Sequence, residues 1–129
     1  MECIFCSIGG WPKNKIIRET TMCYVILDKY PSEYGHMLVV LKQHKSSMIA
    51  ANENEINAMF NIAKEMSCIA KDRLGASGVN VATNIGHDAG QVIEHFHVHV
   101  IPRYGSNQKR KAHIELSDAE SAELIAQLG

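Results

Sequence analysis

The segment EHFHVHVI, residues 94–101, places three histidines at alternating positions in an otherwise apolar run. Side chains of a β-strand alternate between its two faces, so a strand here would carry His95, His97 and His99 on one face and the apolar side chains on the other. Neighbouring imidazoles would then lie roughly 6.5 Å apart, close enough for one phosphate and its bridging oxygens to span them. The segment therefore predicts a row of imidazoles on a rigid strand.

A row of imidazoles points to a functional site. Imidazole titrates near neutral pH, so it can attack phosphorus, shuttle a proton or bind a metal ion. A single histidine in a strand is commonly just a hydrogen-bonded residue, but three on one face repel one another when protonated and pack no better than valine. The three rings would span about 13 Å, too far for all of them to bind one metal ion. This spacing argues against a regulator in which every histidine serves a metal.

The composition is that of an ordinary globular protein. With 129 residues, we expect a single domain over residues 1–129 that buries its core without disulfides. A formal net charge of -1 leaves no global basicity to attract nucleic acid or a membrane. The chain lacks a signal peptide and any apolar run long enough to span a bilayer, which predicts a cytoplasmic protein. In that compartment the four cysteines are expected to be metal ligands or buried thiols.

The remaining periodicity predicts an α+β fold. Short apolar or β-branched segments are expected as further strands: residues 21–28, 35–41 and 79–83. Apolar residues recur at helical spacing from Ile56 to Leu74, and Gly75 stands where a left-handed residue would end that long helix. Ser117 and Glu120 resemble a capping box, which predicts a short last helix through Leu128. Strands joined by a hairpin-like turn and followed by one long helix favour an antiparallel sheet.

A second motif lies near the start of the sequence. Cys3 and Cys6 form a C-x-x-C pair, a spacing that lets two thiolates reach one zinc ion from a tight turn. A redox pair is the alternative, but such a pair usually opens a helix after a strand, and no strand is predicted here. A structural zinc would need two more ligands, for which His44 and one histidine of the row are candidates. Spacing alone does not select among the seven histidines.

These residues resemble the histidine triad (HIT) superfamily, because residues 95–101 fit its His-φ-His-φ-His-φ-φ pattern, where φ is apolar. The resemblance is greatest to the zinc-bearing bacterial members, and it extends over further segments: residues 3–6, 28–31, 35–40 and 89–91. It implies a HIT-like antiparallel sheet with one long helix and a short C-terminal helix. It also implies a homodimer that acts on nucleotides at the α-phosphate.

The same resemblance implies catalytic roles. His97 would attack the α-phosphorus and form a covalent nucleotidyl-histidine intermediate that water later hydrolyses. His99 would bond a non-bridging phosphate oxygen, and Gln91 the bridging or leaving-group oxygen, which offsets charge that grows in the transition state. Asn84 would help to hold the phosphate. His36 would support the row from the neighbouring strand.

The resemblance also implies a nucleoside site. Asp28 would accept hydrogen bonds from both ribose hydroxyls, although an aspartate before Lys-Tyr-Pro could equally start a turn. Apolar residues from two segments would line the base pocket or, without the resemblance, form ordinary core: Ile4, Phe5, Ile8 and Leu27. One position departs from the family pattern: Val92 stands where many members carry a Ser or Thr that contacts phosphate.

Finally, the resemblance implies a structural zinc bound by Cys3, Cys6, His44 and His95, which would tie the start of the chain to the histidine strand. The phosphoryl chemistry itself would need no metal.

The leading hypothesis is a hydrolase or nucleotidyl transferase that acts on purine nucleotides such as dinucleoside polyphosphates or nucleoside phosphoramidates. The alternative is a non-catalytic nucleotide-binding interaction module, against which the combined presence of His97, His99, Gln91 and Asn84 argues.

Overall fold

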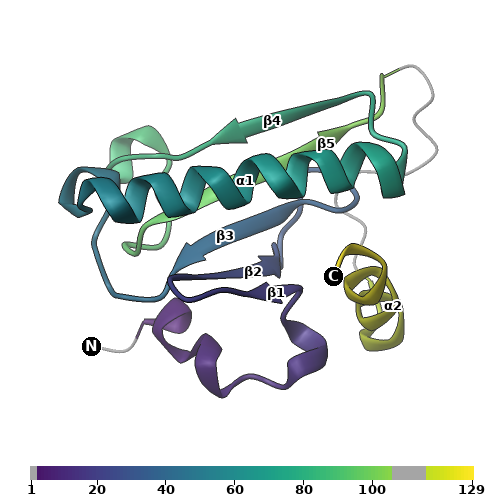
Figure 1. Cartoon of the computed structure of the whole chain (residues 1–129), viewed down its shortest axis with the longest axis horizontal. Coiled ribbons are helices and arrows are strands. Elements are labelled where there is room, and N and C mark those ends of the chain that lie inside the picture. Colours follow the sequence, from purple (N-terminus) through teal and green to yellow (C-terminus); the bar gives the residue numbers. More distant parts are fainter. Residues whose placement is uncertain (1–2, 106–115) are drawn as a thin grey trace.

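The computed structural model describes residues 3–105 and 116–129, in which five strands form one sheet (Figure 1). Their bounds are β1 (Arg18–Glu19), β2 (Cys23–Leu27), β3 (Met37–Leu41), β4 (Gly78–Ala82) and β5 (His97–Arg103). The spatial order is β1-β2-β3-β5-β4, and every neighbouring pair is antiparallel. The prediction of an antiparallel α+β fold is therefore confirmed.

The register of β2, β3 and β5 decides which side chains share a face. Val40 of β3 lies opposite His97 of β5, and Leu38 lies opposite His99. On its other side Leu38 lies opposite Ile26 of β2. Because directly paired residues of neighbouring strands point to the same face, the imidazoles share one face with an apolar surface built from β2 and β3.

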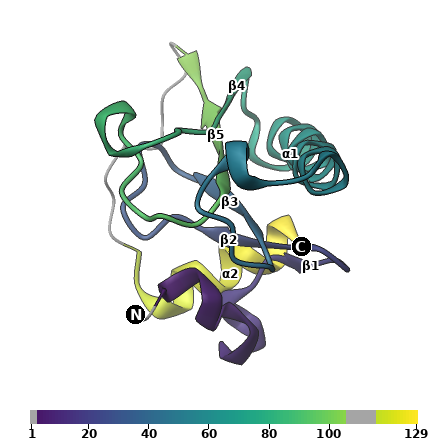
Figure 2. The same ribbon diagram turned by 90° about the vertical axis from the view of Figure 1, so that its left-hand side faces the viewer.

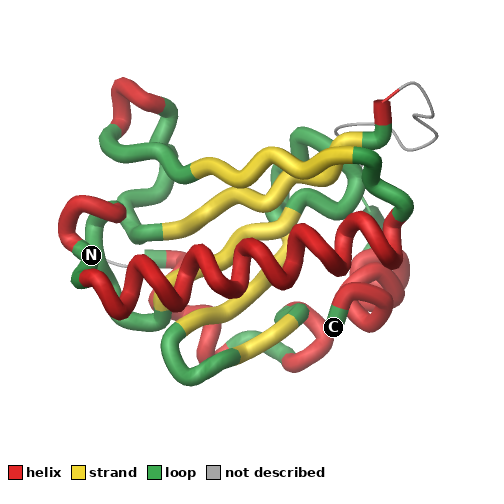
Figure 3. The backbone as a smooth tube through the Cα atoms, turned by 45° about the horizontal axis from the view of Figure 1, so that its top comes forward, coloured by secondary structure: helices red, strands yellow, loops and turns green. Residues whose placement is uncertain are grey.

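The long helix α1 (Glu53–Leu74) covers the other face of the sheet (Figures 1 and 3). Its fully buried positions recur at helical spacing: Met59, Ala63, Met66 and Ala70. Asn52 begins the helix with a capping box, in which its side chain and that of Glu55 each accept the other's backbone N–H. Gly75 ends it with a left-handed φ of 73°, as the sequence predicts.

The short C-terminal helix α2 (Asp118–Leu128) also follows the sequence prediction. Ser117 accepts a hydrogen bond from the Glu120 N–H, and the Glu120 carboxylate accepts one from the Ser117 N–H. Leu124 and Leu128 are buried in the core beneath α1, and the Arg73 guanidinium bonds the Gly129 carbonyl at 2.9 Å. Within the described ranges, neither these helices nor the shorter ones are long and apolar enough to cross a membrane.

Four short 3-10 helices of the described residues lie outside the sheet: η1 (Ile4–Gly10), η2 (Lys13–Lys15), η3 (Met48–Ala50) and η4 (His87–Ala89). Of these, η1 packs on the imidazole-bearing face. In the view of Figure 2, α1 lies on one side of the sheet and the η4 turn on the other. The core is accordingly divided into a large cluster under α1 and a smaller one between the sheet and η1.

The histidine segment differs from the predicted strand at its start. The strand begins at His97, because the His95 N–H turns back to the Ile93 carbonyl at 2.8 Å and the Phe96 N–H bonds the Lys45 carbonyl at 2.7 Å. The alternation of faces nevertheless holds, since Phe96 and the other intervening apolar side chains are fully buried under α1.

Candidate active site and metal site

His97 is held in one tautomer. Its Nδ1–H donates to the His95 carbonyl at 2.6 Å, which leaves the lone pair on Nε2. The Thr83 hydroxyl in turn donates to the His97 carbonyl at 2.7 Å and steadies the strand at this point. Burial lowers the pKa of His97, although the bond to the His95 carbonyl acts in the opposite direction. A neutral ring with a free Nε2 is the form in which histidine is a nucleophile.

His36 and His99 form a directed hydrogen-bond chain. The Ser32 N–H donates to His36 Nδ1 at 3.0 Å, so a neutral His36 carries its proton on Nε2. That nitrogen lies 2.9 Å from His99 Nδ1, which must then be the acceptor. His99 consequently carries its own proton on Nε2 and offers an N–H donor, the group that a phosphate oxygen requires.

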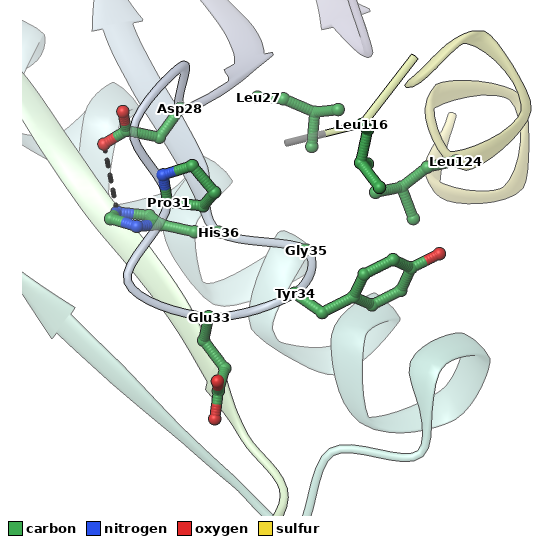
Figure 4. A pocket seen from close by; sticks show the side chains of 9 residues that line it. All are labelled: Leu27, Asp28, Pro31, Glu33, Tyr34, Gly35, His36, Leu116 and Leu124. Carbon is green, nitrogen blue, oxygen red and sulfur yellow. Dashed lines mark ion pairs between the residues drawn. The ribbon is translucent and has the colours of Figure 1, made fainter. Parts of the chain in front are cut away.

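Asp28 starts a turn and also lies beside two histidines. Its Oδ1 accepts the Tyr30 N–H at 2.8 Å, as expected for an aspartate that starts a turn. Its Oδ2 lies 3.4 Å from His36 Nε2 and 3.9 Å from His99 Nδ1. Figure 4 shows the carboxylate pointing toward the His36 ring. Burial nevertheless lowers the pKa of His36 to about 4, with Asp28 only partly opposing it, so the ring is neutral at pH 7.

The proximity of Asp28, His36 and His99 would also suit a metal ion, because their ligand atoms lie within 4.8 Å of one another. The hydrogen-bond directions argue against that use. Since His36 Nδ1 already accepts the Ser32 N–H, its Nε2 carries the proton and has no lone pair for a cation. These three residues are better described as a hydrogen-bond network that orients His99.

The apolar side of the site comes from η1 and the sheet. Phe5 and Ile8 are buried against Ile26 and the neighbouring residues of β3. The Phe5 ring meets the His97 ring edge-on, with centroids 5.0 Å apart. Ile4 is 54% exposed at the start of the same turn. Of the predicted base-pocket residues, Phe5 thus lies beside His97 and Ile8 packs in the same cluster as Phe5.

Leu27 requires a correction, because the structure places it on the opposite face of the sheet. It packs against the cluster under α1, and in Figure 4 it points toward Leu116 and Leu124 of the C-terminal segment. Ile26 occupies the position beside Phe5 instead. Counting strand alternation back from Asp28 would have found it, since residues 26 and 28 share a face.

Gln91 is committed to the backbone. Its side chain is 4% exposed, its Oε1 accepts the Gly86 N–H at 2.8 Å, and its Nε2 donates to the carbonyls of Ser46 and Ile93 at 2.6 and 3.1 Å. An amide with these bonds holds the 84–93 loop against the segment after β3. The structure therefore supports a positioning role for Gln91 and does not present it as a free donor to a leaving-group oxygen.

Asn84 keeps its amide near the loop that follows β4. It is half-buried, and its Nδ2 makes a long contact of 3.5 Å with the Gly90 carbonyl. Gly90 itself has a φ of 97°, which only glycine adopts without strain. Val92, where the family commonly has a hydroxyl, is 89% exposed. The Asn84 amide is thus held only weakly by the loop.

The four predicted metal ligands come together. Cys3, Cys6, His44 and His95 each offer one ligand atom, and all four atoms lie within 4.8 Å of one another. The Sγ atoms of Cys3 and Cys6 are 3.3 and 3.6 Å from His95 Nδ1. The Nδ1 atoms of His44 and His95 are 3.1 Å apart. A tetrahedral zinc would hold sulfur and nitrogen about 3.6 Å apart and two nitrogens about 3.3 Å apart. The donor set and its spacing therefore fit zinc.

The outer nitrogen of His95 completes this fit. Its Nε2–H donates to the Leu41 carbonyl at 2.6 Å, which directs the Nδ1 lone pair toward the thiols. A carbonyl partner on the outer nitrogen is the usual way in which a protein orients a metal-binding histidine. The site joins three segments that are distant in sequence: the start of η1, the segment after β3 and the segment before β5.

Comparison with known proteins identifies the family of this chain. The HIT domain model matches residues 12–106. The crystal structure of a hypothetical histidine triad nucleotide-binding protein from Sulfolobus tokodaii is 33% identical, with a TM-score of 0.87 over 98% of this chain and 89% of that one. A Zn-bound histidine triad family protein from Mycobacterium smegmatis is 32% identical, with a TM-score of 0.84 over 99% and 94% of the two chains.

A relative of named activity is the adenosine 5'-monophosphoramidase of Schizosaccharomyces pombe, which is 32% identical over 105 residues, 80% of this chain and 75% of that protein. The family model covers well over half of the sequence, including His95, His97 and His99. The chain therefore belongs to the HIT family.

Proposed function

We propose that this protein is a nucleotide hydrolase or nucleotidyl transferase that cleaves purine nucleotides at the α-phosphate through His97. The observation that carries the proposal is the 2.6 Å bond from His97 Nδ1–H to the His95 carbonyl, which leaves Nε2 as a nucleophile. The phosphoramidase activity named for its fission-yeast relative supports the same class of reaction.

The proposed reaction has two steps. His97 Nε2 attacks the α-phosphorus, and a P–N bond forms while the bond from phosphorus to the leaving oxygen or nitrogen breaks. The leaving group departs with the bonding electrons and takes a proton from solvent. Water then attacks phosphorus, the P–N bond breaks, the water's proton is lost, and free nucleotide and neutral His97 remain. The His95 carbonyl stabilises the positive ring of the intermediate through the Nδ1–H.

The neighbouring groups support these steps. His99 would donate its Nε2–H to a non-bridging oxygen, because His36 fixes its tautomer. Asp28 would bind the ribose hydroxyls, and Asn84 the phosphate. The base would lie against Phe5 and the apolar residues of β2 and β3. Dinucleoside polyphosphates and nucleoside phosphoramidates both place a suitable leaving group on the α-phosphorus.

We further propose a structural zinc on Cys3, Cys6, His44 and His95, and a homodimer as the working assembly. When bound, zinc would crosslink η1 to the sheet, a structural and not a chemical contribution. The Zn-bound relative from Mycobacterium smegmatis supports the metal. The outer edge of β4, which has no neighbouring strand in the described sheet, supports the dimer.

The experiment is a substrate panel of diadenosine polyphosphates and an adenosine phosphoramidate, run on the wild type and on His97→Ala. We expect the variant to lose turnover by roughly a thousandfold or more, because no other group replaces the nucleophile. Its circular dichroism and its affinity for adenosine monophosphate should stay close to wild type. Mass spectrometry of briefly reacted wild type should find the nucleotidyl adduct on the peptide that contains His97.

Either of two results would contradict the proposal. Undiminished turnover by His97→Ala would remove the covalent mechanism. Tight binding of adenosine monophosphate by a wild type that turns over none of the panel would favour the non-catalytic nucleotide-binding module instead.

A further inference from the structure

The η1 turn is joined to the sheet in only a few ways within the described part of the chain. The thiols of Cys3 and Cys6 contact the imidazoles of His44 and His95 at 3.3 to 3.6 Å. The apolar side chains of η1 pack into the small cluster on the sheet. The hydrogen bonds of Ser7 and Trp11 stay inside the segment. The position of η1 therefore depends on the proposed metal ligands and on one patch of apolar contact.

Phe5 links the metal ligands to the nucleophile. It lies between Cys3 and Cys6 in the sequence, so ligands on both sides set its position. Its ring contacts the His95 ring at a centroid distance of 5.7 Å and the His97 ring at 5.0 Å, both edge-on. One aromatic ring thus touches a proposed metal ligand and the proposed nucleophile, and forms a wall of the proposed base pocket.

We infer that metal binding and nucleotide binding are coupled through Phe5 in this protein. With the metal bound, η1 is held on the sheet and Phe5 completes the wall beside His97. Without the metal, the two thiols and two imidazoles are no longer bound to one ion, and apolar contacts alone hold η1 on the sheet. Nucleotide affinity then falls. This inference rests on the proposed function, because it takes the nucleotide as the ligand of this pocket.

Linkage makes the coupling reciprocal. If metal strengthens nucleotide binding by some factor, nucleotide must strengthen metal binding by the same factor. The metal site is placed to exchange with solvent, because Cys6 is exposed and Cys3 is only partly buried. The arrangement would let the availability of zinc set how much of the protein is ready to bind nucleotide.

The sequence supplies an internal probe for this coupling. Trp11 is the single tryptophan of the chain, and it directly follows η1. Its indole N–H donates to the Ser7 hydroxyl at 3.0 Å, and its ring packs on the cluster around Phe5. Tryptophan emission should therefore change when η1 leaves the sheet, independently of any turnover.

The first experiment compares zinc-loaded protein with protein stripped by a chelator. We expect affinity for adenosine monophosphate, measured by calorimetry, to fall about tenfold on stripping, within the usual range of coupling between sites. Trp11 emission should shift at the same time, and added zinc should reverse both changes. Saturating adenosine monophosphate should in turn raise zinc affinity, measured by chelator competition, by the same factor.

Two variants isolate the role of Phe5. Phe5→Ala keeps the four ligands, so it should retain one equivalent of zinc while binding adenosine monophosphate weakly whether or not zinc is present. If chelation unfolds the wild type, zinc-loaded Phe5→Ala still tests the role of Phe5, because it is compared with zinc-loaded wild type. Cys68→Ser is the matched control, because this exposed cysteine on α1 lies outside the ligand cluster, and it should behave like wild type in both assays.

Three outcomes would overturn the coupling. Equal affinity for adenosine monophosphate in loaded and stripped wild type would do so while the proposed hydrolase function stands. Wild-type affinity and wild-type coupling in zinc-loaded Phe5→Ala would likewise remove Phe5 as the link. Loaded wild type that neither binds adenosine monophosphate nor turns over the substrate panel would instead overturn the proposed function, and the coupling with it.

Discussion

His36 makes the stability of the fold depend on pH. Burial lowers its pKa from 6.5 to about 4, whereas in the unfolded chain it would titrate near its ordinary value. Between these values the unfolded state binds more protons, so stability is complete above pH 6.5 and is lost as the pH falls toward 4. The loss from this residue should reach about 3 kcal/mol.

Urea denaturation of wild type and His36→Gln across that pH range measures this contribution. Glutamine retains one acceptor and one donor but does not titrate, so the variant should lose less stability on acidification. The remaining slope would come from His95, His97 and the half-buried His99, whose pKa values burial also lowers. Exposed His87→Gln is the matched control. Parallel curves for wild type and His36→Gln would show that His36 does not carry the effect.

At single residues, sequence predicts chemistry better than orientation. The placement of His97 and His99 on one face follows from strand alternation, and the structure agrees. The hydrogen bonds of Gln91 could not be predicted in this way. Its side chain bonds backbone groups of Gly86, Ser46 and Ile93, which come together only when the 84–93 loop packs against the segment after β3. The prediction of Leu27 in the base pocket is wrong by one residue, because Ile26 is the residue of β2 that packs beside Phe5.

Among the elements, α1 offers a clean test of helix capping. Asn52 Oδ1 accepts the Glu55 N–H at 2.8 Å, and Glu55 Oε1 accepts the Asn52 N–H at 2.8 Å. Asn52→Ala removes the first bond, so we expect it to lower the free energy of unfolding by about 1 kcal/mol. Asn54→Ala, two residues along the same helix and exposed, makes the same chemical change away from the cap.

Thermal or urea unfolding of both variants gives the comparison. Asn54→Ala should be neutral or slightly stabilising, because alanine has the better helix propensity. If the two substitutions cost the same, the capping box contributes nothing to stability.

The turn between β2 and β3 depends on Gly35. Gly35 has a φ of +84°, and a Cβ built there would lie 2.5 Å from Leu74 Cδ1. Gly75 has a similar φ of +73°, but no atom lies within 4 Å of its Cβ position. Gly75→Ala should therefore show backbone strain alone, about 1 kcal/mol. Gly35→Ala should cost about 1 to 3 kcal/mol more, because the buried Leu74 must also move.

Unfolding midpoints of the two alanine variants measure this difference. Equal losses would mean that Leu74 moves aside freely and that the packing of the turn against α1 adds no constraint.

For the whole molecule, the metal site shows where sequence reasoning needs the fold. Cys3 and Cys6 are visible as a local motif, but spacing along the chain does not select His44 and His95. They meet because β3 and β5 are neighbours in the sheet, so the residues just beyond the end of β3 lie beside those just before β5. The resemblance to zinc-bearing HIT proteins supplied this long-range information, which local periodicity does not contain.

The two edges of the sheet differ in a way that favours assembly through β4. The β1 edge is two residues long and carries the charges of Arg18 and Glu19, which discourage pairing with another strand. The β4 edge, Gly78–Ala82, is five residues long and has no charged side chain, and Val81 is 42% exposed. A second copy could extend the sheet by pairing its own β4 there, related by a two-fold axis.

Light scattering coupled to size exclusion should accordingly give twice the 14.3 kDa chain mass for the wild type. Val81→Lys should give the single-chain mass, because a lysine on this edge strand discourages pairing with another strand. Ile49→Lys, at an exposed aliphatic residue of η3, controls for added charge and should remain dimeric. A monomeric wild type would leave the β4 edge unpaired. A dimeric Val81→Lys would move the interface to another surface, because each copy would bring a lysine of like charge to the paired β4 edges.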